Sequence, residues 1–161
     1  MISILLAASL FAGETSALGW DGLGWGRSPE ELLAARPGTA RVVKDANQDV
    51  LRREYLARDE AEWNGIPVEV RYHFTKNSRQ LVLVKLIPRD AAKCPDLEAR
   101  SLEKLGQVPP LEQKMSRLLG GTLIKHESSY RWDLPQQQSK ALFFSLDYGS
   151  QPICHLIFER R

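Results

Sequence analysis

The clearest pattern along the chain is an alternation of apolar and polar residues between positions 66 and 74. Large apolar residues take every second position of this segment: Ile66, Val68, Val70, Tyr72 and Phe74. Side chains alternate between the two faces of a strand, so this spacing predicts a half-buried strand. Its other face carries Glu69, Arg71 and His73.

Five further segments have the composition of strands. A turn at residues 76–79 leads into a second apolar strand at 81–87, and a less regular strand at 50–57, extending toward Trp63, precedes the pair. After a central polar region, three more strands are expected at residues 122–132, 140–148 and 152–159. The sequence therefore predicts two groups of three strands.

Short helices are expected before each group. Ser28, Pro29 and Glu31 form the start signal of a first helix, which ends near Arg36. Residues 95–106 predict a second helix, and the leucines and methionine of residues 111–119 predict a further helical piece. We expect an α+β fold in which an antiparallel sheet carries short helices packed on one face, built from two helix-then-three-strand units in tandem.

Alternation also assigns faces to the last two strands. We expect one set of residues to face the helices: Leu142, Phe144, Leu146, Tyr148, Cys154, Leu156 and Phe158. The opposite face, free of helices, is expected to carry Phe143, Ile153 and Ile157 beside Arg71, His73 and His155. Phe143, Ile153 and Ile157 are more apolar than the side chains expected on a surface that faces only solvent.

The first residues are typical of a secretory signal. Residues 2–12 are apolar or small, a run too short to span a bilayer, and small residues follow up to Ala17. We expect a signal peptide at residues 1–17 and a single α+β domain at 18–161. The alternative is a buried N-terminal helix or strand, because no basic residue precedes the run. No later stretch predicts a transmembrane segment, and no cysteine follows the run to carry a lipid anchor.

Composition limits the function classes. The chain has 161 residues, 43% hydrophobic and 26% charged, which suits one globular domain. Its formal net charge of +2 is too small for the electrostatic surface of a nucleic-acid binder. We expect no nucleic-acid partner.

The chain has two cysteines, Cys94 and Cys154. In an exported protein an even number favours a disulfide, which here would join the second helix to the last strand. The alternative is a pair of separate buried thiols. The disulfide and the signal together predict a periplasmic or secreted protein.

Motifs for catalysis or metal binding are absent from the sequence. The three histidines, His73, His126 and His155, have none of the spacings of zinc sites, and there is no nucleophile or phosphate-binding motif. We therefore expect no catalytic residues, metal or cofactor. An enzyme, with His73 or His155 as general base of a cell-envelope hydrolase, remains an alternative.

Two tryptophans follow the predicted signal. Trp20 and Trp25 lie in a glycine-rich segment that nearly repeats itself. One interpretation is an aromatic arm that docks on a partner, since tryptophan is enriched in binding hot spots. For Trp25 we favour packing beside the first helix. Trp20 remains a candidate for partner contact.

The segment Trp25-Gly26-Arg27-Ser28-Pro29-Glu30-Glu31, the helix and three strands that follow, and the second round with Cys94 and Cys154 resemble small exported bacterial proteins of the beta-lactamase-inhibitor-protein-like architecture. Assembly lipoproteins of the SmpA/OmlA type look similar. The resemblance implies protein binding without catalysis, through the open surface of the sheet for the inhibitors and as scaffold subunits for the lipoproteins. This chain lacks the lipid-carrying cysteine, so an anchored role does not follow.

The pattern favours an exported, non-catalytic module that binds a protein partner through the helix-free face of its sheet. The candidate contact residues are Arg71, His73, Phe143, Ile153, His155, Ile157 and Trp20. The alternatives are a small-ligand or lipid-binding protein, with its site between helices and sheet, and the hydrolase. The sequence leaves the partner and the oligomeric state open.

Overall fold

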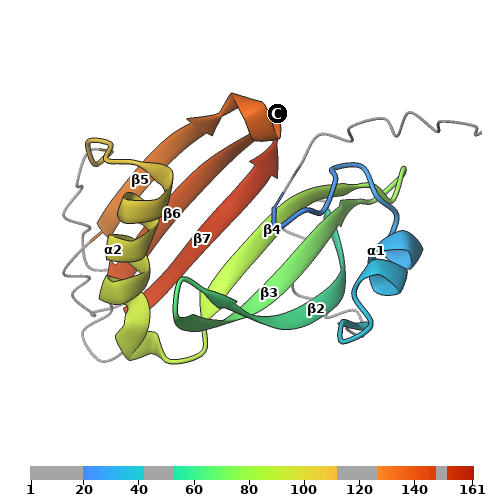
Figure 1. Ribbon diagram of the computed structural model, residues 1–161, viewed down its shortest axis with the longest axis horizontal. Coiled ribbons are helices and arrows are strands. Elements are labelled where there is room, and N and C mark those ends of the chain that lie inside the picture. Colours follow the sequence, from blue (N-terminus) through green and yellow to red (C-terminus); the bar gives the residue numbers. More distant parts are fainter. Residues whose placement is uncertain (1–19, 42–52, 112–126, 148–151) are drawn as a thin grey trace, which may run out of the picture.

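A computed structural model describes residues 20–41, 53–111, 127–147 and 152–161 (Figure 1). The first unit consists of α1 (Pro29–Ala35), β1 (Ala40–Arg41), β2 (Arg53–Trp63), β3 (Ile66–Thr75) and β4 (Leu81–Pro88). The second consists of a 3-10 turn η2 (Ala91–Lys93), α2 (Cys94–Leu105), β5 (Glu127–Leu134), a 3-10 turn η3 (Pro135–Gln137), β6 (Ser139–Asp147) and β7 (Pro152–Arg160).

All the strands belong to one antiparallel sheet with the order β1-β2-β3-β4-β7-β6-β5. The two units join through their last strands, because β4 pairs with β7. Helix α2 lies across β5, β6 and β7 (Figure 1). The predicted α+β class, with helices packed on the sheet, is confirmed.

Local signals fixed the start of α1 as expected. Ser28 Oγ accepts a hydrogen bond from the Glu31 backbone N–H (3.2 Å), and the Glu31 carboxylate accepts one from the Ser28 N–H (2.7 Å). The second helix begins at Cys94 and ends before Gly106, whose φ of 105° suits glycine. The short strand β1 was not expected. Residues 112–119, where a further helical piece is predicted, lie outside the described residues, as does the signal segment 1–17.

The core lies between the helices and the sheet. Leu32 of α1 and Leu97 of α2 belong to the same buried cluster as the inward residues of the strands. Its largest fully buried members are Tyr72, Phe74, Phe143 and Phe158. All five apolar positions of β3 are buried, as the alternation predicts.

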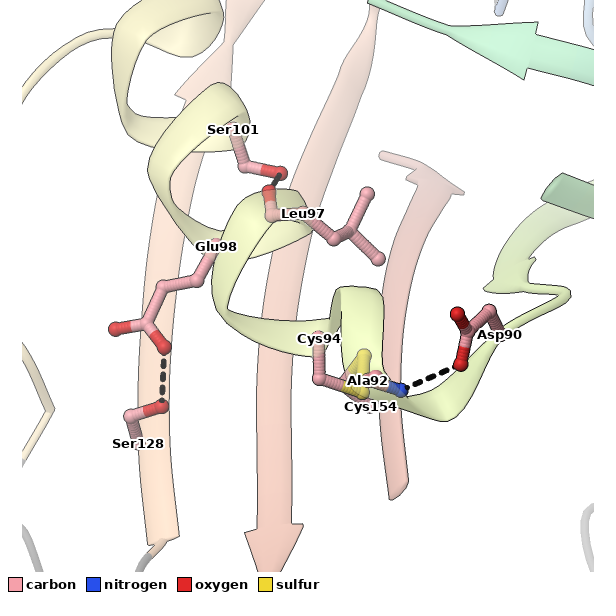
Figure 2. Close-up of a disulfide and its surroundings, with 8 residues drawn as sticks. All are labelled: Asp90, Ala92, Cys94, Leu97, Glu98, Ser101, Ser128 and Cys154. Carbon is pink, nitrogen blue, oxygen red and sulfur yellow. Dashed lines mark hydrogen bonds between the residues drawn. A yellow bond between two sulfur atoms is a disulfide. The ribbon is translucent and has the colours of Figure 1, made fainter. Parts of the chain in front are cut away.

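Hydrogen bonds from polar side chains connect the elements at the edges of this core. The Trp132 indole N–H donates to the Gly106 carbonyl (2.7 Å), which holds β5 against the end of α2. Trp25 donates in the same way to the Gln137 carbonyl (3.0 Å). The Glu98 carboxylate of α2 accepts from the hydroxyls of Ser128 (3.0 Å; Figure 2) and Tyr130 (2.7 Å), so it anchors the helix on β5.

The predicted disulfide is confirmed. Cys94 and Cys154 are bonded, with their Cα atoms 5.6 Å apart, and the bridge joins the first turn of α2 to β7 (Figure 2). Both residues are buried. Leu97 and Ser101 are buried one and two turns further along α2. The covalent bond therefore fixes the helix on the sheet from its N-terminal end.

The face assignment of β6 was wrong. Phe143 is fully buried and pairs with the buried Leu156, so it belongs to the core and not to the open face. Leu142 pairs with Ile157 and is 36% exposed. Consequently Leu142, Phe144 and Leu146 lie on the open side, and the prediction that they face the helices is corrected. Apolar residues occupy both the odd-numbered and the even-numbered positions of this strand, so alternation does not decide which set faces the core.

Trp20 is also not an exposed arm. Its side chain is 5% exposed and belongs to the buried cluster. The Arg36 guanidinium lies over its ring, 5.7 Å from the centroid, and pairs with Asp21 (2.5 Å). The expectation that Trp20 contacts a partner is therefore corrected: it covers the edge of the core. Trp25 packs against the same cluster, as expected.

Within the described ranges, no helix is long and apolar enough to cross a membrane.

Candidate functional site

The candidate site is the face of the sheet that points away from the helices. The strand register places one set of side chains there, and we call those of the four central strands the open face: Glu69, Arg71, His73, Leu83, Lys85, Ile87, Lys140, Leu142, Phe144, Leu146, Ile153, His155, Ile157 and Glu159. These residues come from β3, β4, β7 and β6, so both units contribute. The site exists only because β4 and β7 pair.

One half of the open face is apolar. We call Leu142, Phe144, Leu146, Ile153 and Ile157 the apolar patch. Leu142 is 36% exposed and Ile153 is 44% exposed. Leu111, also 44% exposed, pairs with Ser129 at the edge of β5 and so stands on the same side of the sheet. Thus every large hydrophobic residue that is exposed in the described part of the chain lies on this side.

The other half of the open face carries a pair of adjacent cations. Arg71 of β3 stands directly opposite Lys85 of β4. Glu69 accepts a hydrogen bond from the Arg71 Nε–H, which satisfies part of the guanidinium. Partial burial, together with the neighbouring Arg71, lowers the pKa of Lys85 from its usual value. No ion pair connects Lys85 to a carboxylate in the described ranges.

His155 lies between the two halves. Its ring meets the ring of Phe144 edge-on, with centroids 4.9 Å apart. Burial, then the positive charges of Lys85 and Arg71, lower the pKa of His155 to about 4. Its Nδ1 atom is buried and has no hydrogen-bond partner among the described residues. The imidazole is therefore neutral at pH 7.

This lowered pKa predicts that acid destabilises the fold. In the unfolded chain His155 binds a proton near pH 6.5, whereas in the folded protein it does so only near pH 4. Between these values the unfolded state binds more protons, so stability falls as the pH falls. We expect the free energy of unfolding to drop by about 2 kcal/mol from pH 7 to pH 5.

Urea unfolding at the two pH values measures this drop. Most carboxylates stay ionised at pH 5, so they contribute little to the change in the free energy of unfolding between the two pH values. In the His155→Gln variant the difference between the two pH values should shrink to a few tenths of a kcal/mol. An equal drop in the variant and the wild type would show that another group causes the acid sensitivity.

The structure brings together five of the seven predicted contact residues. Arg71, His73, Ile153, His155 and Ile157 share the open face. Phe143 and Trp20 are in the core.

Sequence reasoning missed several members of this surface, among them Lys85, Leu142, Phe144 and Leu146. Only Lys85 gave a usable signal, because it is the single charged residue in the apolar segment Leu81–Pro88. The other three were assigned to the wrong side of β6.

The hydrolase alternative gains no geometric support at His155. A histidine general base is usually oriented by a carboxylate that hydrogen-bonds to its second nitrogen. The described neighbours that shift the pKa of His155 are two cations, Lys85 and Arg71. Nor do the described residues include a group of three or more histidine, cysteine or acidic side chains placed to hold a metal ion.

A cavity of about 320 Å³ opens on the helix side. Trp20, Trp63, Leu105 and Phe158 line it, but so do the charged residues Asp21, Glu62 and Lys104. The indole N–H groups of both tryptophans are buried and lack a partner in the described part. A ligand in the cavity cannot reach these donors while they are covered. These three charged residues make the cavity more polar than a typical small-molecule site, whose lining is mostly apolar.

Comparison with protein-family models, with curated proteins and with solved structures finds no match to this chain. The resemblance to the beta-lactamase-inhibitor-protein-like and SmpA/OmlA-like architectures therefore stays a prediction from the residues quoted for it. The function has to be inferred from the open face itself.

Proposed function

We propose that this protein is an exported, non-catalytic module that binds another protein through the open face. One observation carries the proposal: the large exposed hydrophobic residues gather on the side of the sheet that the core does not use. Apolar patches with a charged rim mark interaction surfaces, because covering them removes apolar area from water. Leu142 and Ile153, at opposite ends of this patch, are its exposed members, and Arg71 and Glu159 belong to its polar surroundings.

The shape of the site favours a macromolecular partner over a small molecule. The patch and the cations are spread over four adjacent strands rather than gathered in one hollow. Small-molecule sites are concave and enclose most of the ligand, whereas protein interfaces are broad with an apolar centre. A partner protein with an apolar contact surface matches this layout.

Export is the second part of the proposal. The bonded pair Cys94–Cys154 supports it, since disulfides persist in oxidising compartments such as the periplasm and the extracellular space. The apolar run at residues 2–12 supports it independently, as a signal sequence that is removed from the mature chain. The protein would then meet its partner in the periplasm or outside the cell.

The test introduces a charge into the apolar patch. Leu142→Asp and Ile153→Asp are expected to weaken partner binding at least tenfold, because each buries a carboxylate against an apolar surface. The partner is isolated by affinity capture on the wild-type protein, identified by mass spectrometry and purified. Its Kd is then measured for each variant by calorimetry.

Ala99→Asp is the matched control. Ala99 is exposed on α2, on the opposite side of the sheet, and the substitution adds the same charge. It should leave the Kd unchanged. Thermal unfolding checks that all three variants fold. If the captured protein binds the two patch variants as tightly as the wild type, the open face is not the binding site. Dimerisation of the free protein that both variants abolish would identify a second copy as the occupant.

A further inference from the structure

The centre of the open face concentrates positive charge. Arg71 and Lys85 are cross-strand neighbours, and like charges in that position destabilise a sheet. Glu69 compensates Arg71 through its hydrogen bond to Nε. For Lys85 the described part of the chain supplies no ion pair. On β7 two polar side chains flank Ile157, the cross-strand partner of Lys85: His155, which stays neutral, and Glu159, which is placed opposite Leu83.

The position of this pair relative to the apolar patch is informative. Within the four central strands, one row of paired residues contains Arg71, Lys85, Ile157 and Leu142. The register continues this row with Arg58 of β2 and Arg131 of β5. In the middle of the row, two adjacent cations therefore stand beside two adjacent apolar residues. A free inorganic anion would contact the two cations alone, whereas a polypeptide with an acidic residue beside apolar residues would cover all four.

We propose that the partner places a carboxylate of an aspartate or glutamate between Arg71 and Lys85, and its neighbouring apolar side chains on Ile157 and Leu142. This inference rests on the proposed function and specifies the chemistry of the partner. The carboxylate accepts charge-assisted hydrogen bonds from the guanidinium and the ammonium group, which are stronger than neutral ones. Docking also removes water, which strengthens the attraction between the opposite charges.

The arrangement explains why a half-buried lysine stands in an apolar strand. In the free protein Lys85 lies beside a second cation and is partly removed from water. Both effects disfavour its charged form, so the charge of Lys85 does not stabilise the fold. An arriving carboxylate relieves the repulsion between Lys85 and Arg71. The charge of Lys85 thus serves binding rather than folding.

The test reverses this charge and reads the sequence preference of the site. Random dodecapeptides displayed on phage are selected on the immobilised full chain, wild type or Lys85→Glu. Peptides selected by the wild type should be enriched in Asp or Glu next to apolar residues. Lys85→Glu should exchange this preference for Lys or Arg, and the selected acidic peptides should bind it at least about tenfold more weakly.

Two further variants complete the design. Lys85→Met removes the charge with little change in size, and it should abolish the acidic preference even if Lys85→Glu fails to fold. Lys104→Glu makes the same charge reversal on α2 and should retain the preference. Millimolar inorganic phosphate should displace the peptides poorly, because it cannot cover Ile157 and Leu142.

The outcomes separate this inference from the proposed function. Peptides that are lost on Leu142→Asp but show no acidic preference would overturn the inference and leave the binding face in place. An acidic preference that survives both Lys85 variants would overturn it as well. If no peptide is enriched, or if all bind Leu142→Asp as well as the wild type, the open face is not a peptide-binding surface and both proposals fail.

Discussion

Phe143→Ala is expected to lower the free energy of unfolding by about 3–5 kcal/mol. Phe143 is fully buried on the helix side, opposite Leu156, and its ring lies 6.2 Å from that of Tyr130. Truncation removes most of a large apolar side chain and leaves a cavity that a close-packed core fills only in part. Urea unfolding, monitored by circular dichroism, measures the loss.

The adjacent residue provides the control. Leu142 is 36% exposed on the open face, so Leu142→Ala should change the free energy of unfolding by less than about 1 kcal/mol. The same substitution should instead weaken binding to the partner. If Leu142→Ala were the more damaging of the two to the fold, the register of β6 against β7 would be wrong, and the open face would have to be redrawn.

The contrast between these two neighbours shows where sequence reasoning stops. Residues 141–144 read Ala-Leu-Phe-Phe, so both parities of β6 offer an apolar set. The side that faces inward is selected by pairing with β7, where Cys154 is bonded to α2 and thereby fixes the orientation. A strand with such a pattern takes its orientation from long-range contacts, which local alternation does not contain.

Where apolar residues occupy only every second position of a strand, the sequence predicts its buried face correctly. The strict alternation of residues 66–74 predicts the buried face of β3, and with it the positions of Arg71 and His73 on the open side. The start of α1 follows from Ser28 and Glu31, because both of its hydrogen bonds are local. The order of α1, β2, β3, β4, α2, β5, β6 and β7 followed from the same local signals, whereas β1 was not expected.

Trp20 was misplaced for a different reason. A glycine-rich segment has no periodicity, so its sequence does not show whether a tryptophan within it is exposed or folded back. The contact that places it comes from Arg36, at the end of α1, through the guanidinium over the ring. The pairing of β4 with β7 is equally non-local, and it creates the open face by joining two units that are each predictable alone.

Loss of the disulfide is the other change with a large expected effect. The bond joins residues 60 positions apart, and closing a loop of this length restricts the unfolded chain by about 4 kcal/mol in the chain-entropy model. A small domain has a total stability of about 5–15 kcal/mol, so this is a large share. The Cys94→Ala/Cys154→Ala double variant should unfold at a markedly lower urea concentration than the oxidised wild type.

Reduction of the wild type tests the same bond without a substitution, and the reducing agent should leave the double variant unchanged. Since the bridge lies on the helix side and the apolar patch on the other, the double variant should retain its affinity for the partner at temperatures where it is folded. Equal stability of the oxidised and reduced wild type would contradict a structural role for the bond. A loss of affinity in the folded double variant would instead show that the bridge sets the shape of the open face through β7.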